Sequence, residues 1–127
     1  MQKFKKFLLW ILFAIITGAL CGLCGVAFSK SVALVTDIRT QNNWLLYLLP
    51  IGGLLSVGIY KLCRVKNIGT TNVFDCVRTE QDLPKGLAVA VFCGTCISHL
   101  FGSSSGREGA ALQIGGGVAN ILSRAFK

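Results

Sequence analysis

The stretch Gly102–Ala119, GSSSGREGAALQIGGGVA, places an arginine and a glutamate, Arg107 and Glu108, between glycines at the start of an apolar segment. Glycine and serine are poor helix formers, so residues 102–106 are predicted to form an irregular linker. The residues from Ala110 onward favour a helix directly after it. The helix is therefore expected to begin near Glu108.

A helix that begins at Glu108 would make this position an anion site. The start of a helix carries unpaired backbone N–H groups and the positive end of the macrodipole, and both attract anions where water is excluded. The Glu108 carboxylate is expected to occupy the site itself until an external anion displaces it or a proton neutralises it. We interpret Glu108 as a gate made from one side chain, because an ionisable residue inside a membrane segment is a functional-site hypothesis by default.

The apolar run after the glutamate is short. From Gly109 to Ser123 it is about fifteen residues long, whereas roughly twenty are needed to span the hydrocarbon core. The helix is therefore expected to start inside the membrane. Broken helices whose N-termini meet an anion near the midplane are a recurrent device of transporters.

The residues HLFGSSSGREGAALQIGG resemble the G-R/K-E-G-P signature of the CLC family of chloride channels and anion/proton exchangers. The resemblance implies that Glu108 is the gating residue and that Gly106, Arg107, Gly109 and Ala110 belong to the anion site. The family's usual proline is Ala110 here, and the residues upstream are similar to those of the bacterial fluoride-exporting branch. The resemblance thus implies a halide, chloride or fluoride, as the transported anion, with protons as a further partner in exchangers.

The composition is typical of a helical membrane protein. Of the 127 residues, 53% are hydrophobic and 14% are charged, and the mean hydropathy is +0.64. The 13 basic residues outnumber the 5 acidic ones, but they lie at the ends of apolar runs and do not form a patch with interleaved aromatics. They indicate membrane topology, and no nucleic-acid partner is expected.

Three segments are predicted to span the membrane. The first follows three lysines and contains a charge-free run of about 23 residues, which is too long for a signal peptide, the alternative interpretation. A polar loop at residues 36–43 is expected after it. Pro50 is expected to kink the second helix, and Leu83 and Pro84 open the third. The three helices are predicted at about residues 4–36, 44–63 and 83–101.

The basic residues predict the orientation. The lysines at the N-terminus and the cluster of Lys61, Arg64 and Lys66 are placed on the same, cytoplasmic side. The sequence therefore predicts a multi-pass protein of the plasma membrane, embedded in the lipid bilayer, with a cytoplasmic N-terminus.

Residues 67–80 are too short and too polar to span, and they predict a short helix at about 71–79 with Thr or Asn as its cap. In the CLC family the corresponding place holds G-S-G-I-P, whose serine helps to bind the central anion. The resemblance implies that Gly69, Thr70 and Thr71 contribute to the anion site. The alternative, that the hydroxyl only caps the helix, is compatible with this role.

Several other residues favour structural roles. We expect the lone histidine, His99, to be hydrogen-bonded to neighbouring backbone or to the serine loop, although a proton relay is the alternative. The C-x-x-C pairs at Cys21 and Cys24 and at Cys93 and Cys96 lie inside apolar helices without basic neighbours, so we expect packing and not metal or redox chemistry. No metal or cofactor is expected. The glycine spacing also departs from a P-loop, so no enzyme is expected.

The resemblance implies an all-α integral membrane fold. The CLC membrane domain is built from two inverted repeats and is several times as long as residues 1–127, which match the first part of the first repeat. That part holds the three spanning helices, the short helix, and a helix at about 108–126 that starts within the membrane. We expect this chain to be an incomplete portion that does not conduct alone, and the full-length protein to be a homodimer. The alternatives are a self-sufficient small oligomeric channel and a non-transporting membrane accessory protein.

Overall fold

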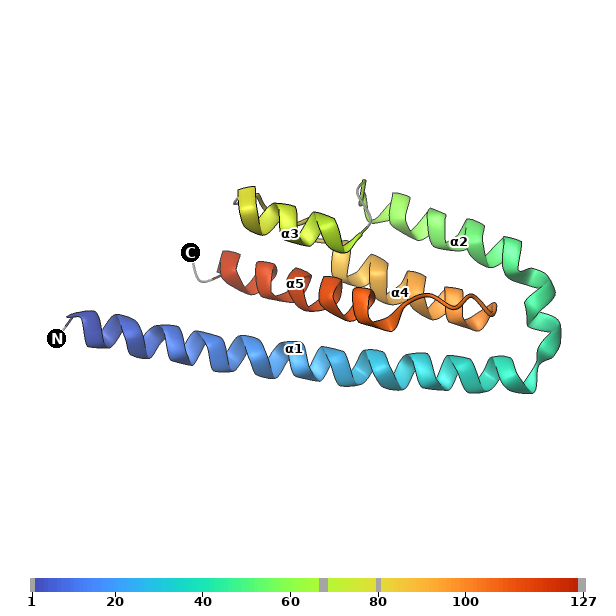
Figure 1. Ribbon diagram of the computed structural model, residues 1–127, viewed down its shortest axis with the longest axis horizontal. Helices are drawn as coiled ribbons and strands as arrows, with labels where there is room; N and C mark the ends of the chain where they lie inside the picture. The colour runs from blue at the N-terminus through green and yellow to red at the C-terminus, as the bar shows by residue number, and fades with distance from the viewer. Residues whose placement is uncertain (1, 67–68, 80, 126–127) are drawn as a thin grey trace.

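The computed structural model describes residues 2–66, 69–79 and 81–125, and every element in this part is helical. The prediction of an all-α chain is confirmed for these residues. In Figure 1 the helix α1 lies along one side, the chain reverses at its end, and the other helices pack back along it. The elements are α1 (Gln2–Gln41), the 3-10 helix η1 (Asn43–Leu48), α2 (Leu49–Leu62), α3 (Thr70–Thr79), α4 (Leu87–Leu100) and α5 (Arg107–Ala125).

The helix α1 is longer than expected. It continues to Gln41, so most of the segment 36–43, which the sequence analysis predicted as a loop, is helical. The segment contains no glycine or proline, and Asn42 Nδ2 donates to the carbonyl oxygen of Ile38 at 3.1 Å, which satisfies one of the last free carbonyls. At 40 residues the helix is about 60 Å long, about twice the hydrocarbon thickness. Polarity is therefore a poor guide to where α1 ends.

The second apolar segment consists of η1 and α2. The backbone changes from 3-10 to α geometry at Leu49, and Pro50 stands in the first turn of α2. Proline is tolerated there because the first turn has no intrahelical partner for its missing N–H. The proline expected to kink the second helix therefore lies where α2 begins, directly after the 3-10 turn.

In the part of the chain that the structure describes, two segments are long and apolar enough to cross a membrane, Lys3–Gln41 and Asn43–Leu62. The third spanning helix predicted from the sequence is not among them, because Leu83 and Pro84 lie outside a helix and α4 keeps only 14 residues. Such a helix is about 21 Å long, less than the ~30 Å of the hydrocarbon core. The charge-free run overestimated the helix because it included non-helical residues at both ends.

The core lies where α1, α4 and α5 meet, and α2 packs antiparallel on α4. The rings of Phe28 and Phe92 meet edge to face with 5.7 Å between their centroids. A β-carbon at Gly94 would lie 3.1 Å from the Tyr60 ring, so α2 and α4 approach closely there. Buried apolar residues from the three central helices are Phe28, Val32, Leu87, Ala90, Val91, Ala110 and Ile114.

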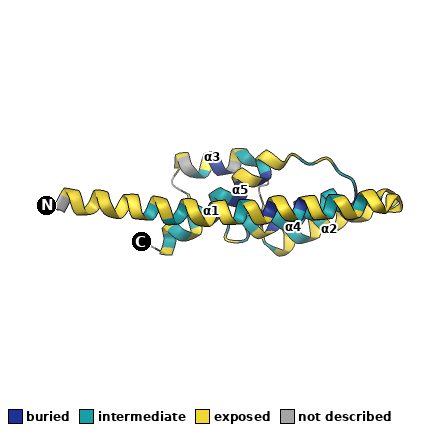
Figure 2. Cartoon of the chain, turned by 90° about the horizontal axis from the view of Figure 1, so that it is seen from below, coloured by how far each residue is buried: buried dark blue, intermediate teal, exposed yellow. Residues whose placement is uncertain are grey.

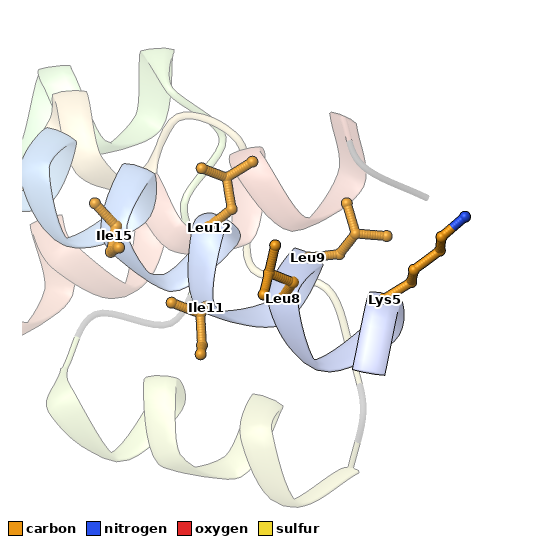
Figure 3. Close-up of a pocket in the computed structure, with 6 residues that line it drawn as sticks. All are labelled: Lys5, Leu8, Leu9, Ile11, Leu12 and Ile15. Carbon is orange, nitrogen blue, oxygen red and sulfur yellow. The ribbon is translucent and has the colours of Figure 1, made fainter. Parts of the chain in front are cut away.

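The N-terminal half of α1 extends past this core. Figure 2 shows it mostly exposed, and its outward side chains are large and apolar. A shallow apolar groove of about 420 Å³ lies on this half, and Figure 3 shows its lining side chains on a single helix. A helix with so much apolar surface and so few contacts suits a lipid environment. The groove is lined by Lys5, Leu8, Leu9, Ile11, Leu12 and Ile15.

Within the described ranges the cysteines form no disulfide, and each is half-buried. The Cys21 thiol donates to the carbonyl oxygen of Gly115 at 3.6 Å and so joins α1 to α5. Four others, Cys24, Cys63, Cys76 and Cys96, pack against the core. The packing role predicted for the two C-x-x-C pairs is confirmed for Cys24 and Cys96.

Candidate functional site

The predicted gate stands at the N-terminus of α5. This helix begins at Arg107, so Glu108 lies in its first turn. Gly106, Arg107 and Glu108 are exposed, Gly109 is half-buried and Ala110 is buried. The first amides of an α-helix have no intrahelical acceptor, so they are free to bind an anion beside the Glu108 carboxylate.

The linker before α5 folds back along α4. Gly102 has φ +93°, a left-handed conformation that favours glycine, and a β-carbon there would overlap Leu46 of η1. His99 Nε2 lies 3.2 Å from the carbonyl oxygen of Ser105, so the hydrogen bond to the serine loop that the sequence favoured is confirmed. Figure 1 shows the linker running past the end of α4 and returning before α5 begins. The N-terminus of α5 therefore lies within the length of the neighbouring helices and not at their ends.

The second predicted segment stands at the N-terminus of α3. Gly69 precedes this helix with φ +151°, again a conformation that favours glycine, and Thr70 is its first residue. Gly69 and Thr70 are half-buried, and Thr71 is exposed. A β-carbon built on Gly109 would lie 3.3 Å from the Thr70 methyl carbon Cγ2. The structure therefore brings together two segments that are far apart in the chain.

The helices α3 and α5 run in the same direction. Beyond the contact of Thr70 with Gly109, a β-carbon on Gly116 would lie 3.0 Å from Val73 Cγ1. Because both contacts advance toward the C-terminal ends, the two N-termini lie side by side, as Figure 1 shows. The positive ends of two helix dipoles at one place both favour the same anion.

Three polar residues of α5 that the sequence analysis did not single out make contacts in the structure. Gln113 is 7% exposed, its Nε2 donates to the carbonyl oxygen of Gly109 at 3.3 Å, and its Oε1 has no hydrogen-bond partner within the described ranges. Asn120 and Arg124 bind the turn before α4 at the other end of the helix. A polar side chain within an otherwise apolar helix is the signal that could have identified Gln113.

No group of three or more His, Cys, Asp or Glu side chains that could hold a metal ion is present among the residues the structure describes. The arrangement at the two N-termini instead offers backbone amides, one hydroxyl and one carboxylate. These groups can bind an anion and exchange a proton, which is chemistry suited to permeation.

Comparisons with known proteins identify the family of the chain. Residues 52–127 match the family described as voltage gated chloride channel, and this range includes both helix N-termini. A chloride/fluoride channel protein of Pseudomonas syringae pv. tomato (strain ATCC BAA-871 / DC3000) is 31% identical over 121 residues, which are 93% of this chain and 26% of the relative. The chain thus spans about a quarter of the length of that relative. No solved structure matches the chain. With more than half of its residues matched to the family, including the glutamate motif, the chain belongs to the voltage-gated chloride channel family.

Proposed function

We propose that this chain supplies part of a transmembrane pathway for halide anions, chloride or fluoride, in which Glu108 is the gate. The observation that carries the proposal is the close approach of Thr70 to Gly109, which sets the N-termini of α3 and α5 side by side. The arrangement of these helices as the first part of a CLC-type inverted repeat is part of the proposal.

In this mechanism the anion binds backbone amides at two helix starts. The first-turn amides near Arg107 to Ala110 hold it on one side, and the turn Gly69 to Thr71 contributes amides and a hydroxyl on the other. The Glu108 carboxylate competes for the same positive field. Protonation removes its charge, the side chain leaves, and the anion enters. Proton binding and anion binding therefore favour each other.

The membrane setting follows from the same proposal. The two long apolar segments lie in a lipid bilayer, the plasma membrane, in a multi-pass arrangement with a cytoplasmic N-terminus. The name of the relative includes both chloride and fluoride, which supports a halide without choosing between them. The full-length protein is proposed to be a homodimer.

Halide titration of the purified chain in detergent micelles, by calorimetry, tests the gate. We expect halide to bind more tightly at acidic than at neutral pH, by about fivefold or more, because the protonated Glu108 no longer competes. Glu108→Gln imitates the protonated acid, so its affinity should match that of the acidified wild type at every pH. Asp37→Asn, which neutralises an exposed carboxylate on α1, should keep the pH dependence. If Glu108→Gln retained the pH response, the assignment of the gate would be wrong.

A further inference from the structure

The C-terminal end of α5 is held on the turn that precedes α4. Arg124 Nη2 donates to the carbonyl oxygen of Leu83 at 2.9 Å, and Asn120 Nδ2 donates to the same oxygen at 3.3 Å. Arg124 Nε also lies 3.3 Å from Asp82 Oδ1. Two side chains about one helical turn apart therefore converge on one backbone oxygen. We call this set of contacts the Leu83 latch.

Besides its core side chains Ala110 and Ile114, α5 makes three close approaches through glycines. Glycine allows two backbones to come near each other, but it has no side chain to interlock with its neighbour. Such contacts fix the distance between two helices. They constrain less firmly where one helix lies along its own axis. The Cys21 thiol that binds Gly115 is a weak donor. The glycine contacts are Gly109 with Thr70, Gly116 with Val73, and Gly117 with Ala88.

The latch can act at the far end of the helix because α5 is continuous. It contains 19 residues in unbroken α geometry and no proline, so an axial shift at Arg124 is carried to Glu108. Hydrogen bonds to the carbonyl oxygen of Leu83 are directional, and Leu83 is itself 4% exposed. A partly buried and directional contact of this kind limits axial sliding in a way that the glycine contacts do not.

We propose that Arg124, together with Asn120, is a positioning residue for the anion site. The Leu83 latch sets how far α5 projects toward α3, and thereby where Glu108 and the first amides of α5 lie relative to Thr70. The bond to the Leu83 carbonyl carries the effect, because Asp82 is 65% exposed and an exposed ion pair contributes little. The role at an anion site rests on the proposed function, but the position of α5 can be measured without it.

Hydrogen exchange of the chain in detergent micelles, followed by mass spectrometry, tests the position of α5. In Arg124→Gln we expect the first hydrogen-bonded amides of α5, at residues 111–114, to exchange about fivefold faster or more. Arg78→Gln removes an equal charge from the last turn of α3 and should leave these amides as in the wild type. Faster exchange confined to residues 118–125 would overturn the proposal, because it would show a purely local role.

Two further variants test the chemistry of the latch. Arg124→Lys keeps a donor that can reach the Leu83 carbonyl, so exchange at residues 111–114 should stay within about twofold of the wild type. Asp82→Asn should also leave it unchanged. If Arg124→Lys loosened α5 as much as Arg124→Gln does, or if Asp82→Asn did so, the carbonyl bond would not be the positioning contact. If Arg124→Gln fails to fold, Asn120→Ala is the substitute because it removes only one of the two hydrogen bonds. Faster exchange at residues 111–114 in that variant would support the proposal, and wild-type exchange would contradict it.

Halide titration separates this proposal from the proposed function. Arg124→Gln should weaken halide binding by about threefold or more while leaving its pH dependence intact, because the latch moves the gate and does not titrate it. Glu108→Gln should show the opposite pattern, with lost pH dependence and wild-type exchange at residues 111–114. If the wild-type chain bound no halide, the proposed function would fail, and the exchange measurements would still decide whether the latch positions α5.

Discussion

Single residues decide how closely the helices meet, and Gly52 is the clearest case. A β-carbon at this position would overlap the Phe101 ring, which closes the end of α4 at 9% exposure. The sequence showed Gly52 only as one of a pair of glycines after Pro50. Its role follows from where Phe101 lies in three dimensions, because a ring placed by another helix cannot be read from neighbours in the chain.

We expect Gly52→Ala to destabilise the protein by about 1–3 kcal/mol, the usual cost of overpacking a filled contact. Gly58→Ala on the same helix is the matched control, because a β-carbon there meets nothing within 4 Å. That control should be neutral or gain about 0.5–1 kcal/mol, since alanine favours a helix over glycine. Unfolding of both variants in detergent, followed by circular dichroism, measures the difference. Equal stability of the two variants would contradict this account of Gly52.

At the scale of elements, the decisive feature is the parallel pairing of α3 with α5. The sequence predicted a short helix near Thr70 and a second helix start near Glu108, and the resemblance alone related the two to one site. Their contact depends on Gly109, whose missing side chain leaves space for the Thr70 methyl group. Which residues of α3 and α5 meet depends on the tertiary structure, because a long connection separates the two helices. No local sequence pattern indicates this register.

We expect Gly109→Val to push α3 away from α5 and to weaken halide binding by about tenfold, because misplacing a site by about 1 Å can cost that much or more. Gly115→Ala is the control, since a β-carbon at Gly115 meets nothing within 4 Å. The same calorimetric titration measures both. Wild-type affinity in Gly109→Val would show that the two N-termini do not share one anion site.

At the scale of the whole molecule, α1 and α2 run in opposite directions with the reversal at η1 (Figure 1). In the proposed topology, the lysines at the start of α1 lie on the same side of the apolar layer as the basic residues at the end of α2 and directly after it, Lys61, Arg64 and Lys66. The positive-inside rule predicts that this side is cytoplasmic. The end of α1 at Gln41 would then face the opposite compartment.

Reporter fusions in a bacterial host test this orientation. Green fluorescent protein joined ahead of Met1 should fluoresce, because it folds in the cytoplasm. Alkaline phosphatase placed after Gln41 should be active, because it needs the oxidising side of the membrane. If green fluorescent protein placed after Gln41 fluoresced and alkaline phosphatase placed there were inactive, the predicted orientation would be wrong.

The amino-acid sequence by itself determined the helical class, the two long apolar segments and the helix start at the glutamate motif. These features depend on local composition, because apolar length, glycine-rich linkers and flanking charge act within one segment. It also indicated the hydrogen bond of His99, whose partner Ser105 is six residues away. It misjudged residues 36–43 and the length of α4, where polarity and lack of charge are poor guides to helix ends.

Only the tertiary structure decided which helix ends meet. The approach of Thr70 to Gly109 and the convergence of Asn120 and Arg124 on the Leu83 carbonyl join residues that are 37 to 41 positions apart along the chain. Such contacts depend on the packing of every helix between them, because each one fixes the position of the next. The residues of the candidate anion site could therefore be predicted from the sequence. That they come together at one place follows from how the helices pack.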